Sequence, residues 1–223
     1  MDALALPAVA AALAWSTQYA IVPRIPEPTA DEWTPGWTKP TYAGLASPRD
    51  QTAAGLLGLL GGASALACPP WQVPVMVVLA GPVASLALVD ARTTYLPVSL
   101  TRLCQLLAVV AMIAGLTLSS TPGPLAIRWA VAATATWLVF WLMWRLTRSL
   151  GYGDVRLAPL LALGPAAGSL ESWTWFLVLG TGIAAAWGLA TQLWRRSRPS
   201  PLGTIFPYGP GLVLGCWLAV ALS

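Results

Sequence analysis

Long apolar runs separated by short polar connections occupy most of this 223-residue sequence. A helix that crosses a bilayer needs about 20 mostly apolar residues, and only 9% of the residues here are charged, against roughly 25% in a soluble domain. The sequence therefore predicts an all-α integral membrane protein, a polytopic bundle of about eight transmembrane helices that forms one membrane-embedded domain over residues 1–223. The expected spans lie at 3–22, 52–68, 71–90, 100–118, 125–146, 155–170, 172–194 and 206–222.

The basic residues predict the orientation of this bundle. If the N-terminus lies outside, eleven of the twelve Lys and Arg residues fall on the cytoplasmic side and only Arg128 falls outside. Cytoplasmic loops of membrane proteins carry an excess of basic residues, so we expect an external N-terminus. Nucleic acid is not an expected partner, because its binding needs basic residues clustered on one exposed face. The eleven residues are Arg24, Lys39, Arg49, Arg92, Arg102, Arg145, Arg148, Arg156, Arg195, Arg196 and Arg198.

The sequence lacks the residue that is both the commonest metal ligand and the usual general base at neutral pH. It contains no histidine, and its three cysteines form no C-x-x-C pair. We therefore expect no metal and no cofactor, so hydrolytic chemistry would depend on carboxylates, hydroxyls or backbone groups. The proline-rich segment 23–51 is predicted to be an extended cytoplasmic loop without zinc-binding cysteines.

Two acidic residues lie at the ends of apolar runs. Asp90 ends the third run, and Asp154 follows the turn Gly151-Tyr152-Gly153 after the fifth. The charge count puts both at the cytoplasmic boundary, so we expect them to meet. Two carboxylates in one poorly solvated site cannot both ionise easily, and the pair then supplies an acid and a base without histidine.

Local ion pairing is the alternative for each aspartate. Asp90 lies two residues before Arg92, and Asp154 lies two residues before Arg156. An acid near hydrocarbon is costly and indicates a functional site, and the occurrence of two at one depth favours a shared site. Asp50, in contrast, falls in the predicted aqueous loop, where we expect its substitution to be neutral.

Three segments carry a resemblance to a known family. Leu88–Pro97 contains an aspartate followed by a Leu-Pro pair, Gly151–Leu157 contains Gly-x-Gly-Asp, and Phe206–Pro210 reads Phe-Pro-Tyr-Gly-Pro. In this order they resemble the type IV prepilin peptidases, which are GxGD-type intramembrane aspartic proteases. The resemblance covers the chain from about residue 71 to its end. Arg156 stands where a lysine is usual in this family.

The resemblance implies an activity and a set of site residues. It implies an aspartic endopeptidase that cleaves the leader peptide of a prepilin or pseudopilin at the cytoplasmic face of the bacterial cytoplasmic membrane, in the service of a type IV pilus or of protein secretion. The partners implied are this substrate, with its leader and apolar N-terminal helix, and membrane lipid. Asp90 and Asp154 would be catalytic, and Gly151, Gly153, Pro97, Pro207, Gly209 and Pro210 would shape the substrate loop and the helix starts.

One part of the chain departs from the family pattern. Full-length members carry a four-cysteine zinc site after the first helix, associated with N-methylation of the new amino terminus, whereas segment 23–51 has no cysteine. The chain therefore resembles the short, peptidase-only members. Two other classes stay open, a small proton-coupled transporter, because carboxylates in membranes also mark ion pathways, and a non-catalytic scaffold of a pilus or secretion system. A scaffold would tolerate asparagine at Asp90 or Asp154, and a peptidase would not.

Overall fold

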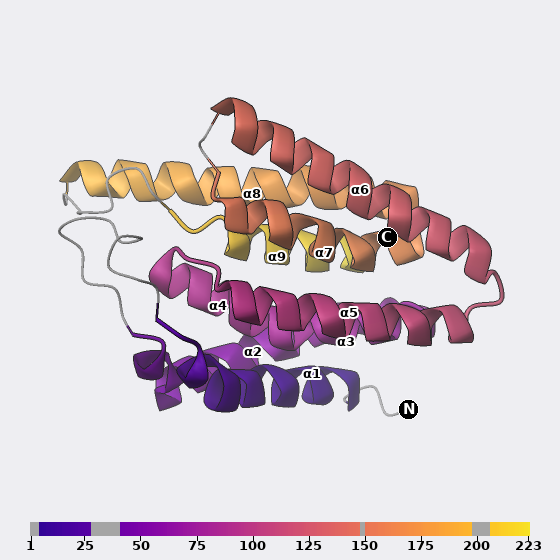
Figure 1. The fold of residues 1–223 in the computed structure, drawn as a ribbon, viewed down its shortest axis with the longest axis horizontal. Helices are drawn as coiled ribbons and strands as arrows, with labels where there is room; N and C mark the ends of the chain where they lie inside the picture. The colour runs from indigo at the N-terminus through magenta and orange to yellow at the C-terminus, as the bar shows by residue number, and fades with distance from the viewer. Residues whose placement is uncertain (1–4, 28–40, 148–149, 198–205) are drawn as a thin grey trace.

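The computed structural model describes residues 5–27, 41–147, 150–197 and 206–223, and all regular secondary structure in these ranges is helical (Figure 1). The all-α class predicted from the sequence is therefore confirmed. Five helices of the described residues are long and apolar enough to cross a membrane, and they indicate an α-helical membrane protein. They are Ala5–Arg24, Val73–Thr93, Val98–Leu118, Pro122–Thr147 and Leu170–Trp194.

Each predicted apolar run contains a helix in the structure, but not every helix has the length of a complete span. Helices α2 and α7 have 17 residues and α9 has 13, fewer than the about 20 that a spanning helix needs. The α-helices are α1 (Ala5–Ser16), α2 (Pro48–Ser64), α3 (Val73–Ala80), α4 (Pro82–Thr93), α5 (Val98–Leu118), α6 (Pro122–Thr147), α7 (Tyr152–Gly168), α8 (Leu170–Ser197) and α9 (Gly209–Ala221). The π-helix is η1 (Thr17–Ile21), and the 3-10 helices are η2 (Val22–Arg24), η4 (Ala43–Ala46) and η5 (Ala65–Ala67).

The third predicted span bends between α3 and α4. Gly81 leaves the helical region with φ −91° and ψ −99°, and Pro82 follows it without an N–H to donate. Gly81 also lies against α1, because a Cβ added there would be 2.9 Å from the Cβ of Leu13. This span is the most buried of the five, and α4, which carries Asp90, therefore stands in the interior of the bundle.

Helix α7 is surrounded by other helices of the bundle. Every residue from Leu160 to Ala167 is buried, and the helix packs against α6, α8 and α9. Pro165 removes the N–H that would bond to the carbonyl of Leu161, and the Sγ of Cys216 lies 3.4 Å from that oxygen and donates to it. Neighbouring helices thus satisfy backbone groups that proline leaves free.

Part of the segment predicted to be an extended loop is folded. Tyr42 and Leu45 are buried, and the carbonyl of Leu45 accepts a hydrogen bond of 2.7 Å from the Nε2 of Gln18. The prediction is therefore wrong for residues 42–51, because these apolar side chains pack against the end of the first helix and α2 begins at Pro48. Residues 28–40 lie outside the described ranges.

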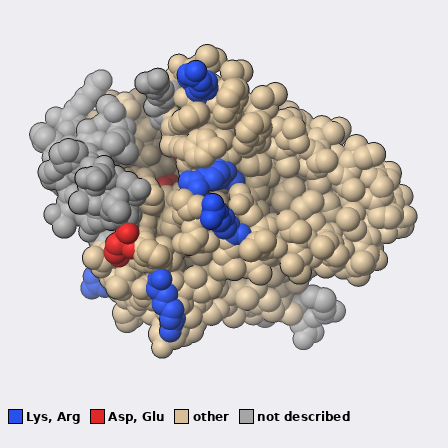
Figure 2. Space-filling model, in the orientation of Figure 1, with Lys and Arg blue, Asp and Glu red and all other residues tan. Residues whose placement is uncertain are grey.

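The helices run back and forth, so their ends gather at two ends of the bundle. Figure 1 shows the ends of α4 and α8 and the starts of α7 and α9 in the left-hand half. On the face drawn in Figure 2, arginine side chains lie in the left-hand half and around the middle, and the right-hand tip shows none. The predicted basic residues Lys39, Arg148 and Arg198 lie outside the described ranges.

Candidate active site

Asp90 lies in the last turn of α4, beside the start of α9. Its backbone carbonyl accepts a hydrogen bond of 2.7 Å from Thr94, whose left-handed conformation (φ 54°) ends the helix. Its Oδ2 accepts a buried hydrogen bond of 2.9 Å from the N–H of Gly209. The side chain is only 4% exposed. The first N–H groups of a helix favour negative charge, so α9 holds the carboxylate of Asp90 in place.

Asp154 is the third residue of α7. Its Oδ2 accepts a hydrogen bond of 3.2 Å from the N–H of Gly151, and its own N–H donates to the Gly151 carbonyl at 3.0 Å. The residue is 6% exposed. Both aspartates are therefore nearly buried, and each is fixed by a backbone N–H from a glycine of a motif segment.

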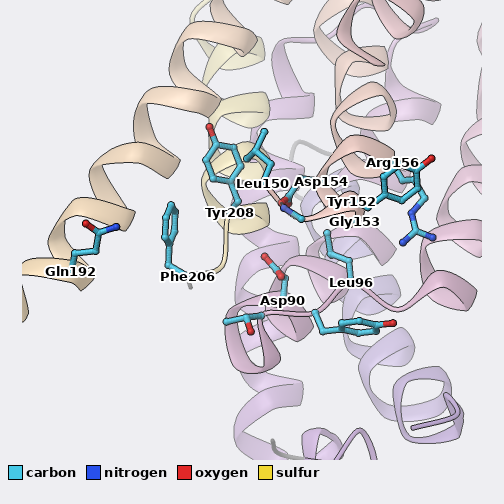
Figure 3. A pocket seen from close by; sticks show the side chains of 13 residues that line it. Asp90, Leu96, Leu150, Tyr152, Gly153, Asp154, Arg156, Gln192, Phe206 and Tyr208 are labelled. Carbon is cyan, nitrogen blue, oxygen red and sulfur yellow. The ribbon is translucent and has the colours of Figure 1, made fainter. Parts of the chain in front are cut away.

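The two carboxylates line one cavity of about 660 Å³. Figure 3 shows Asp90 and Asp154 facing this space from different elements, with Tyr208 and Leu150 beside them. The structure thus brings together two carboxylates that are distant in the sequence, at the end of the bundle where α4 ends and α7 and α9 begin. The cavity is lined by Asp90, Thr94, Tyr95, Leu96, Leu150, Gly151, Tyr152, Gly153, Asp154, Arg156, Gln192, Phe206 and Tyr208.

The second motif glycine packs against the Leu-Pro pair. A Cβ added to Gly153 would lie 2.8 Å from the Cβ of Leu96, so only glycine permits this approach. Pro97 is buried and precedes α5, where its carbonyl accepts hydrogen bonds from the backbone and side chain of Thr101 at 2.9 and 2.8 Å. The connection between α4 and α5 is thereby held against the start of α7.

The third motif segment, Phe206–Pro210, contributes residues to two cavities. Gly209 contacts Asp90 closely, because a Cβ added there would lie 2.8 Å from Oδ2, and Tyr208 lines the aspartate cavity. Pro207 and Pro210 instead line a separate apolar cavity. Pro210 lies in the first turn of α9, where its missing N–H leaves no helical hydrogen bond unmade.

The two arginines near the aspartates have other partners. Arg92 forms an ion pair with Asp50, with its Nη2 2.9 Å from Oδ1. The guanidinium carbon of Arg156 lies 5.4 Å from the centroid of the Tyr152 ring, and the edge of that ring meets Trp144 of α6. Both arginines are thus held by groups other than the aspartate two residues before them.

Asp50 is nearly buried, so the prediction that it lies in an aqueous loop is wrong. It is 7% exposed, and besides Arg92 its Oδ2 accepts a hydrogen bond of 2.6 Å from the Oγ of Ser47. Ser47 is the N-cap of α2 and accepts in turn from the Asp50 N–H at 3.2 Å. The sequence signal was the pattern of a serine followed three residues later by an acid, which marks the start of a helix.

We expect Asp50→Asn to lower the free energy of unfolding of the purified protein in detergent by about 1 kcal/mol, because the cap of α2 is weakened and Arg92 loses its anionic partner. The estimate is modest because half of the Arg92 side chain faces outward. Differential scanning fluorimetry of the detergent-solubilised variants measures the shift. Arg49→Gln is the control, since Arg49 is exposed one residue away. An unchanged melting temperature for Asp50→Asn would contradict the structural role of this pair.

Two residues that line the cavity, Leu150 and Gln192, lie outside the three motif segments. Gln192 lies on α8, and Figure 3 shows it across the cavity from the aspartates, beside Phe206. Sequence reasoning missed it, although a polar residue inside the predicted span 172–194 was the available signal. Within the described ranges, no group of three His, Cys, Asp or Glu side chains is arranged to hold a metal, and the absence of a metal stays a prediction.

Comparison of the chain with known proteins finds no similar family or structure. No family model matches the chain, and no curated protein or solved structure matches it either. The fold and the site therefore define the class directly, an α-helical protein of membrane composition in which two nearly buried aspartates from separate helices line one cavity.

Proposed function

We propose that this chain is a membrane-embedded aspartic endopeptidase of the type IV prepilin peptidase kind. The observation that carries the proposal is the shared cavity of Asp90 and Asp154. The three motif segments support it further because they contact one another around that cavity. Leu96 lies against Gly153, and Gly209 donates to Asp90.

The proposed reaction uses the two aspartates as one unit. The ionised carboxylate takes a proton from water, whose oxygen attacks the scissile carbonyl carbon. The protonated partner donates a hydrogen bond to the carbonyl oxygen. As the bond between carbon and nitrogen breaks, the leaving amine takes a proton from the pair, which returns to its starting state. General acid and base catalysis of this kind contributes about 10²- to 10⁴-fold, and positioning in the cavity supplies more.

The proposed substrate is a prepilin or pseudopilin whose leader is removed at the cytoplasmic face of the bacterial cytoplasmic membrane. The split of basic residues, eleven to one, supports that orientation. The cavity lies at the bundle end that the charge count assigns to the cytoplasm, so a peptide bond just outside the hydrocarbon would reach it. Because segment 23–51 has no cysteine, the proposal includes neither the zinc site nor N-methylation.

Co-expression tests this proposal. A bacterial strain without a prepilin peptidase of its own should accumulate a full-length prepilin, and introducing this chain should convert it to the shorter, processed form on a denaturing gel. A vector without the chain is the control. If only full-length prepilins from several pilus and secretion systems are found while the chain is present in the membrane, the peptidase proposal fails and the scaffold or transporter class gains support.

A further inference from the structure

A second cavity, of about 240 Å³ and almost entirely apolar, lies beside the aspartates. Its walls come from α2, α4, α8 and α9. Of these, α4 and α8 also line the aspartate cavity, and α9 donates a hydrogen bond to the carboxylate of Asp90. We call it the apolar cavity. It is lined by Leu57, Ala87, Leu88, Ala91, Ile183, Trp187, Pro207, Pro210, Gly211, Val213, Leu214 and Trp217.

The apolar cavity lies next to the backbone segments that carry and contact Asp90. Ala91 follows Asp90 on α4 and lines the apolar cavity. On the facing segment, Gly209 donates its N–H to Asp90, whereas Pro207 and Pro210 on either side of it line the apolar cavity. The carboxylate and the apolar walls therefore share the same two pieces of backbone.

The two cavities follow each other along the bundle. On α8, Gln192 lines the aspartate cavity, and Trp187 and Ile183 line the apolar one. At a rise of 1.5 Å per helical residue, Trp187 and Ile183 lie about 7 and 13 Å from Gln192, toward the start of α8. On α9, Leu214 lies about 7 Å beyond Gly209 by the same rise. The apolar cavity thus extends from the level of the aspartates, at Ala91 and Pro207, deeper into the apolar part of the bundle.

One side of the apolar cavity is open to the surroundings. Trp187 and Leu214 are 56% and 38% exposed, and Ala91 is exposed as well. At the depth of Trp187 and Leu214 the surroundings of a membrane bundle are lipid. The small side chain of Ala91 leaves room for a helix to come close, whereas Gly211 is packed against Ala184 of α8.

We propose that the apolar cavity docks the apolar helix of the peptidase substrate, which enters sideways from the bilayer. This inference rests on the proposed function. A peptide inside hydrocarbon must be helical to satisfy its backbone, whereas cleavage requires an accessible peptide bond. A helix seated in the apolar cavity ends at the aspartates, and the bond that precedes it then reaches the carboxylates.

The size of the apolar cavity fits this occupant. Its 240 Å³ is below the roughly 300–1,000 Å³ typical of a pocket that encloses a whole small molecule. It suits a few large apolar side chains from one face of a helix that otherwise lies in lipid. A lipid acyl chain is the competing occupant, and the test below separates the two.

Photocrosslinking tests the docking site without requiring cleavage. A benzophenone amino acid is placed at Leu214 in the Asp154→Asn protein, which is then reconstituted with a prepilin and irradiated. We expect a covalent adduct with the prepilin at least about tenfold stronger than from the same probe at Val110, which is 65% exposed on α5. Equal yields from the two positions, or an adduct with lipid alone, would overturn the docking site.

A steric variant gives a second readout. Leu214→Trp, at a partly exposed position that tolerates a larger side chain, should raise KM for a prepilin about tenfold and leave kcat within a few-fold, because docking is blocked and chemistry is not. Val110→Trp is the matched control. An unchanged KM contradicts the docking site. If the wild-type protein cleaves prepilins but the probe at position 214 gives no adduct, the docking site is wrong and the peptidase function stands. If the probe gives an adduct with a prepilin that the wild-type protein never cleaves, only the peptidase function is contradicted.

Discussion

Replacing either Asp90 or Asp154 by asparagine is expected to lower the rate of prepilin cleavage by at least about 10³-fold. Asparagine nearly preserves the size of the side chain but neither takes nor gives a proton at neutral pH. Each aspartate is held by a backbone N–H that an amide oxygen also accepts, so the fold should survive. Initial rates of leader release by equal amounts of the purified, folded variants measure the effect.

The double variant should be no slower than either single one, because the two carboxylates act as one unit and their effects are not additive. Glu171→Gln is the control, since Glu171 is an exposed acid in the first turn of α8 and lies outside the cavity. Near-normal cleavage by either single variant would rule out the shared-proton mechanism and favour the scaffold or transporter classes.

Gly209→Val is expected to reduce the rate of cleavage by about 10²-fold, while the amount of protein in the membrane stays close to that of the wild type. A Cβ at Gly209 would lie 2.8 Å from Asp90 Oδ2 and 3.3 Å from a methyl carbon of Leu157, so the carboxylate must move. A displacement of about 1 Å costs a reaction of this kind roughly 10²-fold. The rate is read from the same leader-release assay, together with the melting temperature.

Gly123→Val is the matched control for this substitution. Gly123 also lies at the start of a helix, α6, but a Cβ there meets nothing within 4 Å. Gly209→Ala should fall between the wild type and Gly209→Val, because it adds one methyl group instead of a branched side chain. If Gly209→Val cleaves at the normal rate, α9 does not position Asp90.

The sequence predicted the helices well because apolar runs are long and the connections between them are short. It also placed Asp90 and Asp154 at one depth, since that inference needs only the span order and the basic residues. Polarity alone does not tell whether lipid or protein surrounds a helix. The 17 residues of α7 are shielded by other helices, so the run at 155–170 that was predicted to be a span is a protein-buried helix with fewer residues than a bilayer crossing needs.

Contacts between distant segments could not be predicted in the same way. The ion pair of Asp50 with Arg92 joins the start of α2 to the end of α4, and no periodic pattern marks it. The approach of Gly153 to Leu96 likewise depends on how α7 packs beside the connection between α4 and α5. The motif segments suggested that these residues belong together, but only the fold gives the contacts.

Hydrolysis of a prepilin by the purified protein in lipid vesicles, followed by mass spectrometry in water enriched in heavy oxygen, tests the central claim most directly. The account predicts two products whose masses sum to the substrate plus one water, cut just before the apolar helix, with heavy oxygen in the new carboxyl group of the leader. An intact substrate after prolonged incubation, or the same products from protein carrying both Asp90→Asn and Asp154→Asn, would contradict it.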